Sequence, residues 1–362
     1  MISQEETTNN NNNTEEEISN NKHTFNDPCD EFAPFSDSEL KQLLQNDEIP
    51  VSKRSRMLYA LKQWTESEDK ISRAIDILSV GFKSKSALLR HEIAYVMGQM
   101  RSEVAIPILE NILSNMSEDS MVRHEAGEAL GAIGSPSALP TLEKFVNDEY
   151  REVRETCELA ILNIQYQQEK AKNPQNNQDS IFSPFSSVDP APACSDDKKL
   201  KFDDIKNTFL DLSKPLFERY KAMFTLRNIA SQYLELDKHD YMLCYKRKAQ
   251  AIEVLCQGLL NPEEGALFKH EVAFVLGQIQ EQSAADALES TLRDKNQHAM
   301  VRHEAAEALG SISDPESLKL LEEFQADEVE AVKDSCVVAI DMHNYWSAFL
   351  SLHKNDEDGE QQ

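Results

Sequence analysis

Four His-Glu dipeptides recur along this chain at two repeating distances, and their side chains are the ones best suited to chemistry. They are His91-Glu92, His124-Glu125, His270-Glu271 and His303-Glu304. Neighbouring pairs within each half are 33 residues apart, and equivalent pairs in the two halves are 179 residues apart. Imidazole and carboxylate groups are common ligands of iron and manganese in proteins. The duplicated set therefore predicts two metal ions, one in each half or both shared across the halves.

The sequence around these pairs is repeated as well. Residues 121–133 read MVRHEAGEALGAI and residues 300–312 read MVRHEAAEALGSI, so eleven of the thirteen positions are identical. Duplication alone would also copy an unimportant dipeptide. The fourth unit of each half, however, carries Glu155-Thr156 and Asp334-Ser335 at the equivalent place, so the repeat itself does not require histidine there. The four retained pairs favour metal binding over a purely structural role.

The elements that must position these pairs are predicted to be helices. Ile93, Val96, Met97 and Met100 recur at the spacing of one helix face, and no alternating strand pattern stands out. A glycine follows each histidine seven residues later, where close helix approach or helix termination is expected. These glycines are Gly98, Gly131, Gly277 and Gly310. Because adjacent helices lie ~8–10 Å apart, imidazoles at the same height on neighbouring helices can reach a shared point.

A period in the low thirties with two short helices per unit is typical of a helical solenoid. We predict an all-α fold with two pseudo-symmetric halves of about four helix pairs each. The predicted segments are a disordered Asn- and Glu-rich tail (1–33), an N-terminal half (34–166), a polar linker (167–199), a C-terminal half (200–350) and an acidic tail (351–362). The first units of the two halves are offset by only 165 residues, which predicts an insertion near residues 235–248.

The composition limits the partners. A net charge of -27 over 362 residues argues against nucleic-acid binding, which needs clustered Lys and Arg, and it suits a basic protein substrate. No apolar stretch approaches the roughly 18 residues that span a bilayer, and no secretory signal is visible, so no membrane partner is expected. The six cysteines show no CxxC spacing, which favours a reducing cytoplasmic or nuclear setting.

The residue types also limit the metal. Two histidines and one carboxylate are the usual ligands of non-haem Fe(II), and no cysteine lies in register, so iron or manganese is favoured over structural zinc. Four converging carboxylates would repel one another unless a cation is bound. Glu128 and Glu307, four residues after His124 and His303, are candidates for hydrogen bonding to the ligands. The basic residues before each histidine are expected on the solenoid surface. They are Arg90, Arg123, Lys269 and Arg302.

The strings around the four pairs resemble those of the deoxyhypusine hydroxylase family. They are RHEIAYVMGQ at 90–99, VRHEAGEALG at 122–131, KHEVAFVLGQ at 269–278 and VRHEAAEALG at 301–310. The resemblance extends from about residue 35 to residue 350. It implies a HEAT-like helical-repeat solenoid and a di-iron monooxygenase that holds two Fe2+ ions per chain and uses dioxygen as co-substrate.

The resemblance also implies a substrate and roles for individual residues. The substrate would be the deoxyhypusine residue of the hypusine-containing eukaryotic translation factor, hydroxylated in the final step of hypusine biosynthesis. The implied metal ligands are His91, His124, Glu125, His270, His303 and Glu304. Glu92 and Glu271 would bind the protonated amines of the substrate or act as further ligands. A monomer that depends on an external electron donor is expected.

Two other functions are compatible with the residues alone. The first is a non-enzymatic repeat scaffold that binds a peptide, which predicts no bound metal and tolerance of substitution at all four histidines. The second is a mononuclear or dizinc hydrolase on the same scaffold, because paired metals also serve hydrolysis. A hydrolase of this kind would be colourless and active without oxygen.

Overall fold

The computed structural model describes residues 31–172, 183–194, 201–231 and 241–359, and all regular secondary structure within them is helical. The α-helices form eight pairs. The first helices of the pairs are α2 (Asp37–Gln45), α4 (Glu68–Ser79), α6 (Ile106–Ser114), α8 (Leu139–Phe145), α10 (Phe202–Leu210), α12 (Tyr241–Leu260), α14 (Ala285–Arg293) and α16 (Pro315–Phe324). Another eight follow in alternation, as α3 (Val51–Lys62), α5 (Ala87–Gln99), α7 (Ser120–Ile133), α9 (Arg151–Lys172), α11 (Leu216–Ser231), α13 (Ala266–Ile279), α15 (Ala299–Ile312) and α17 (Glu330–Gly359). The predicted all-α solenoid is confirmed.

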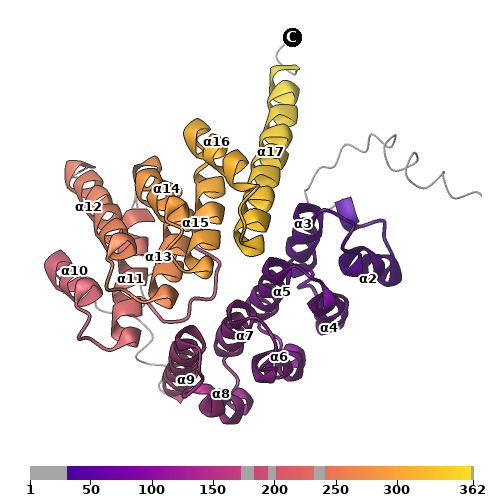
Figure 1. Cartoon of the computed structure of the whole chain (residues 1–362), viewed down its shortest axis with the longest axis horizontal. Helices are drawn as coiled ribbons and strands as arrows, with labels where there is room; N and C mark the ends of the chain where they lie inside the picture. The colour runs from indigo at the N-terminus through magenta and orange to yellow at the C-terminus, as the bar shows by residue number, and fades with distance from the viewer. Residues whose placement is uncertain (1–30, 173–182, 195–200, 232–240, 360–362) are drawn as a thin grey trace, which may run out of the picture.

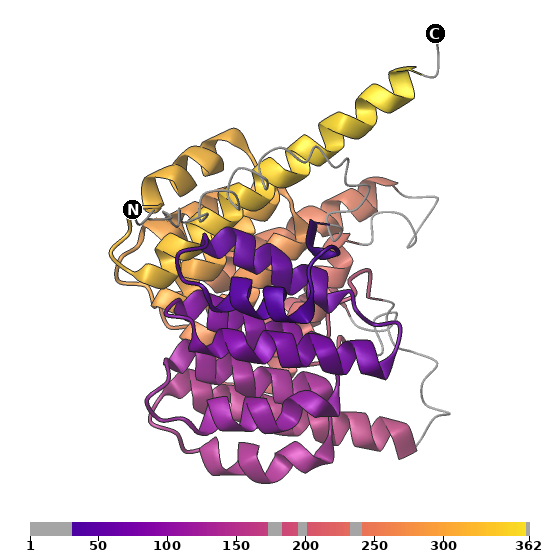
Figure 2. The same ribbon diagram turned by 90° about the vertical axis from the view of Figure 1, so that its right-hand side faces the viewer.

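The second helix of each pair lines the inside of a ring (Figure 1). In the first half α5 packs against α7 and α7 against α9, and in the second half α13 packs against α15 and α15 against α17. The halves meet at two seams, where α9 contacts α11 and α17 contacts α3. Figure 2 shows the first half as successive layers and the end of α17 projecting beyond the ring. The four helices that carry the His-Glu pairs thus surround one centre.

Glycine allows the inner helices to approach closely. A Cβ atom on Gly98 of α5 would lie 2.7 Å from the Cα atom of Ala129 on α7. The equivalent pair in the second half is Gly277 of α13 and Ala308 of α15, where the corresponding distance is 3.0 Å. Both glycines lie inside their helices, so of the two predicted roles the structure shows close approach.

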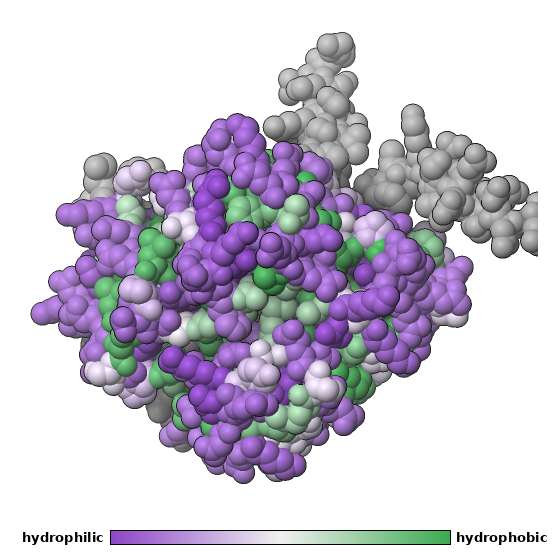
Figure 3. All heavy atoms as spheres, viewed as in Figure 1, coloured by the Kyte–Doolittle hydropathy of each residue, from purple (hydrophilic) through white to green (hydrophobic). Residues whose placement is uncertain are grey.

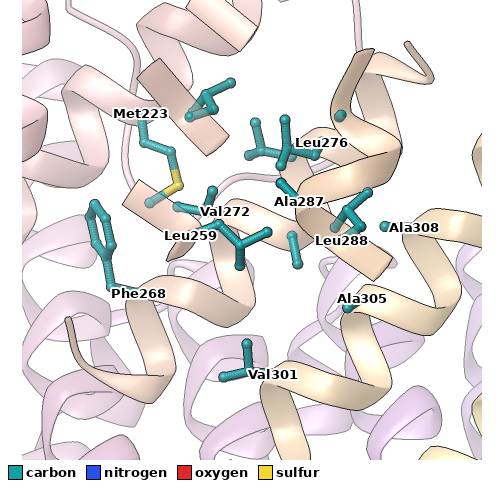
Figure 4. Close-up of a cluster of buried hydrophobic side chains, with 14 of the residues drawn as sticks. Met223, Leu259, Phe268, Val272, Leu276, Ala287, Leu288, Val301, Ala305 and Ala308 are labelled. Carbon is teal, nitrogen blue, oxygen red and sulfur yellow. The ribbon is translucent and has the colours of Figure 1, made fainter. Parts of the chain in front are cut away.

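Each half has its own apolar core. In the second half Met223, Phe268, Val272 and Leu276 are buried together (Figure 4). The two cores also exchange residues: Met121 and Leu159 of the first half join the core of the second, and Val338 of the second joins the core of the first. Burial of apolar surface therefore holds the halves together as well as the repeats.

The basic residues before the histidines are not all on the surface. The guanidinium groups of Arg123 and Arg302 are buried and pair with Asp148 and Asp327 at 2.6 Å. Each also donates to the carbonyl at the end of the preceding helix, Leu113 or Leu292. The surface prediction is wrong for these two arginines, because they fasten one repeat to the next.

The described residues touch the predicted segment boundaries at several points. Residues 167–172 continue α9, residues 183–194 pack between the halves, and α12 begins at Tyr241, inside the predicted insertion. The division into halves at 34–166 and 200–350 stays a prediction, and most of the 1–33 tail, together with residues 360–362, lies outside the described residues. No described helix is long and apolar enough to cross a membrane. Figure 3 shows a mostly hydrophilic face with hydrophobic residues between the helices.

Substitution of Gly98 by alanine tests the close approach. The new methyl group would collide with the backbone of α7, so we expect Gly98→Ala to lower the free energy of unfolding by about 1–3 kcal/mol. Chemical denaturation measures the change. The control is Gly127→Ala in α7, where the nearest atom is a Thr156 side-chain carbon at 3.3 Å and the equivalent residue is Ala306. Equal effects of the two substitutions would contradict the packing argument.

Candidate metal centre

The four histidines occupy the same place in four helices. His91, His124, His270 and His303 are each the fifth residue of α5, α7, α13 and α15. Side chains fix the start of three of these helices, since Ser86 caps α5, Asp119 caps α7 and His298 caps α15. Equal phasing from the helix start is why a sequence repeat becomes a spatial repeat.

The structure brings the four imidazole rings together at the centre of the ring of helices. Within each half the ring centroids are 5.5 Å apart for His91 and His124 and 5.2 Å apart for His270 and His303. Across the halves His91 lies 5.1 Å from His303, and His124 lies 5.3 Å from His270. All four side chains are buried. Residues 179 positions apart in sequence thus contribute to one cluster.

Most nitrogens of this cluster have no hydrogen-bond partner. Among the described residues, both ring nitrogens of His124, His270 and His303 and the Nε2 atom of His91 are buried without one. A buried polar atom left in this way costs about 1–3 kcal/mol, so several together need an explanation. A metal ion that accepts these lone pairs is the simplest one. The donor set therefore fits a metal.

The carboxylates of the second pair in each half lie against the histidine of the first. The Glu125 Oε2 atom is 3.2 Å from His91 Nε2, and the Glu304 Oε2 atom is 3.3 Å from His270 Nε2. Three groups of potential ligand atoms lie within 4.8 Å of one another. They are His91 with His124 and His270, His270 with His303 and Glu304, and His124 with Glu125 and Glu128. The first group combines both halves.

Burial and mutual repulsion set the charges of the imidazoles. The pKa of His124 and that of His303 lie well below the ordinary value, because burial and the neighbouring histidines disfavour the cation. Neutral imidazole is the form that binds a metal. The pKa of His91 is instead raised, since the attraction of Glu125 and Glu92 outweighs the opposing effect of burial.

Glu92 is held in place by two neighbours. It accepts a 2.6 Å hydrogen bond from the hydroxyl of Tyr59 on α3, and its other oxygen lies 3.1 Å from Nδ1 of His91. Burial raises the pKa of Glu92, but these contacts with His91 and Tyr59 outweigh burial and lower it. Glu92 therefore stays anionic. Tyr59 did not figure in the predicted site, although its replacement by Phe224 in the second half marks where the two halves differ.

The remaining carboxyls are in a less favourable environment. Burial raises the pKa of Glu271, Glu128 and Glu307 well above the ordinary value, and neighbouring carboxylates raise it further. Glu307 lies 3.8 Å from His303 Nδ1, and it accepts a hydrogen bond from Ser335. A positively charged ligand would relieve this repulsion.

A cavity of about 270 Å3 opens beside the histidine cluster. Its wall contains His91, His270 and the Glu residues of both halves, so the potential ligands are accessible from it. Tyr95 and Phe274 face each other across it at 6.1 Å between ring centroids. Packing was the expected role of this pair, and both rings also line the cavity.

Part of the linker contributes to the cavity wall, which the sequence did not reveal. Val188, Asp189 and Pro190 line the cavity. Gln99 binds both the amide and the carbonyl of Val188, and Gln278 donates to Ser187. Both glutamines had been expected to be simple polar groups at helix ends. Their place in the two equivalent strings was the available signal.

A ring of helical repeats with a buried histidine-carboxylate centre defines a helical-repeat protein with a candidate metal site. The profile of HEAT repeats matches residues 75–161 and 252–341. The deoxyhypusine hydroxylase of Dictyostelium discoideum is 40% identical over 317 residues, covering 88% of this chain and 91% of that protein. That of Lentinula edodes is 45% identical over 307 residues, covering 81% and 86%.

A solved structure agrees with these relatives. The structure of human deoxyhypusine hydroxylase in complex with glycerol superposes with a TM-score of 0.72 at 37% identity, covering 88% of this chain and 97% of that one. The chain belongs to the deoxyhypusine hydroxylase family. It is therefore an enzyme, a hydroxylase, which excludes the non-enzymatic scaffold and the hydrolase.

The raised pKa of Glu128 predicts a pH-dependent stability of the metal-free protein. A carboxyl whose folded pKa lies above 4.5 binds more protons folded than unfolded, so it reduces stability as the pH rises above 4.5. We expect metal-free Glu128→Gln to unfold at a higher temperature than the unsubstituted protein at about pH 7.5, with a smaller difference near pH 4.5. Scanning calorimetry measures both. An equal difference at both pH values, or the same behaviour in the exposed Glu143→Gln control, would contradict this cause.

Proposed function

We propose that this enzyme hydroxylates the deoxyhypusine residue of the hypusine-containing eukaryotic translation factor, with two Fe2+ ions per chain and dioxygen as co-substrate. The observation that carries the proposal is the convergence of four His-Glu pairs with seven buried ring nitrogens that have no hydrogen-bond partner among the described residues. The printed activity of the relatives supports the substrate. Nitrogen and oxygen ligands without cysteine suit iron better than structural zinc.

Six residues would hold the two metal ions. They are His91, His124, Glu125, His270, His303 and Glu304. In support, the carboxylates of Glu125 and Glu304 already lie beside the imidazoles of His91 and His270. Binding would also satisfy the nitrogens that are otherwise buried without a partner.

Bound iron would supply the activation of dioxygen that breaking a C–H bond requires. The overall reaction balances when one oxygen atom enters the C–H bond as a hydroxyl group and the other leaves as water. It consumes two protons and two electrons from an external reductant. The part of the protein is to bind the side chain, to orient one carbon toward the centre and to limit access of water.

Glu92 and Glu271 would bind the amines of the substrate. Deoxyhypusine is a long side chain with protonated amines, and carboxylates bind such groups by charge-assisted hydrogen bonds. Glu92 is buried and anionic, held by Tyr59 and His91, so it offers a fixed negative charge. Glu271 lies among other carboxyls, so an incoming ammonium group would relieve their repulsion. Glu128 and Glu307 would support the ligands and strengthen this negative field.

We further propose that the enzyme acts as a monomer in the cytoplasm or the nucleus. The acidic charge of -27 supports a basic protein partner rather than nucleic acid.

Metal analysis tests the ligands. We expect about two irons per chain in protein reconstituted without oxygen, and at most about one in His124→Ala, because that substitution removes a ligand near both halves. Elemental analysis gives the ratio. The control is His298→Asn, which removes a histidine outside the cluster and keeps a capping side chain. Full iron loading of His124→Ala would refute its role, and zinc in place of iron would refute the metal.

Kinetics separate substrate binding from metal binding. Loss of a charge-assisted hydrogen bond costs about 1.5–3 kcal/mol. We therefore expect Glu92→Gln and Glu271→Gln to raise KM for the deoxyhypusine-bearing protein at least tenfold while keeping about two irons per chain. The exposed Glu143→Gln variant is the control. A loss of iron in either variant would show that the residue is a metal ligand instead.

A further inference from the structure

The two halves leave two equivalent approaches to the centre, one at each seam. The first lies between α9 and α11, and the second lies between α17 and α3. Pseudo-symmetry pairs their residues at an offset of 179, so Glu128 and Leu159 of the first seam correspond to Glu307 and Val338 of the second. A single protein side chain needs only one approach. The structure distinguishes the two.

A segment of the linker, residues 183–194, fills the first approach, and we call it the strap. Arg227 of α11 binds both carboxylate oxygens of Asp189, at 2.6 and 2.7 Å. Asn163 of α9 donates to the carbonyl of Asp189, and the hydroxyl of Thr225 accepts from the amide of Cys194. Together with the bonds from Gln99 and Gln278, these contacts fasten the strap to both halves.

The apolar part of the strap packs into the seam. Pro190 and Ala191 are buried, and Ala191 belongs to the core of the second half. Beside Pro190 only a small void of about 10 Å3 remains, lined by residues of α7 and α9. Its walls include Glu128, Gly131, Leu159 and Asn163. The first approach is therefore closed.

The same surface is open at the second seam. The equivalent residues Glu307, Gly310, Val338 and Met342 line a hollow of about 400 Å3. Among the described residues no counterpart of the strap enters it. Where Arg227 holds the strap, the equivalent residue here is Lys62, which lies 5.5 Å from the ring of Tyr95. The second seam thus lacks the arginine that fastens the strap.

The hollow is continuous with the central cavity. Tyr59, Gln280, Glu307 and Ser311 line both. The passage between them carries Glu307, and just beyond it lies Glu92, which Tyr59 holds by a hydrogen bond. A chain with protonated amines would meet these carboxylates in turn on its way to the histidine cluster.

We propose that the deoxyhypusine side chain enters along the α3–α17 seam, between Tyr59 and Ser311, and that the strap reserves this entrance by closing the other one. This inference rests on the proposed function. It assigns Glu307 to the path of the substrate amine, and it makes the strap a positioning element that removes the symmetry of the cavity.

A bulky side chain at the entrance tests the proposal. Ser311 is exposed, and its hydroxyl only returns a hydrogen bond to the carbonyl of Glu307, so replacement leaves the core intact. We expect Ser311→Trp to weaken binding of the deoxyhypusine-bearing protein at least tenfold. Binding is measured by titration of iron-loaded protein without oxygen, and KM is measured in air. Ser311→Arg, which keeps a strong helix former and adds a repelling charge, should act in the same direction.

The matched control is Ser186→Trp, which places the same bulk on an exposed position of the strap. It should bind the substrate as the unsubstituted protein does, and all variants should keep about two irons and their melting temperature. Normal binding by both Ser311 variants, or weaker binding by Ser186→Trp alone, would overturn the proposed entrance. Absence of hydroxylation by the unsubstituted protein would instead refute the proposed function, and this inference with it.

Discussion

Close contact between the inner helices determines the geometry of the whole site. Gly98, Gly131, Gly277 and Gly310 each meet an alanine of the next inner helix, at distances that leave no room for a Cβ atom. Because each glycine lies seven residues after a histidine, about 10 Å along the helix, the same contact recurs at the same height in four helices. The imidazoles of adjacent helices then approach within 5.5 and 5.2 Å. Wider spacing would separate the potential ligands of one metal ion.

Rotation of these helices is fixed by the buried arginines. Arg123 immediately precedes His124, and its guanidinium group is bound to Asp148 at the start of the next repeat. Successive residues point about 100° apart around a helix, so fastening the arginine to the next repeat also fixes the direction of the histidine. Arg302 and Asp327 do the same in the second half. A buried ion pair adds little net stability, but losing one partner is costly, so the pair favours one rotation over others.

The sequence predicts most of the fold and the members of the site, because a repeat copies local structure and spacing together. The phase of His91, His124, His270 and His303 was readable, and so was the glycine that follows each. What could not be read were contacts between segments that have no repeat. Arg123 looked like a surface residue because the sequence does not show its partner Asp148. The strap looked like an ordinary polar linker, since only the seam it fills gives Pro190 and Asp189 their role.

Tyr59 illustrates the same limit at one residue. Its place in the repeat predicted a buried aromatic ring, and its equivalent Phe224 is buried. Only the structure places its hydroxyl 2.6 Å from Glu92. The hydroxyl, Lys62 and the strap are all differences between the halves, and they lie at the two seams. The duplicated residues build a symmetric centre that suits two equivalent metal ions. A substrate with one reactive carbon has no such symmetry, so its recognition must come from residues in which the halves differ.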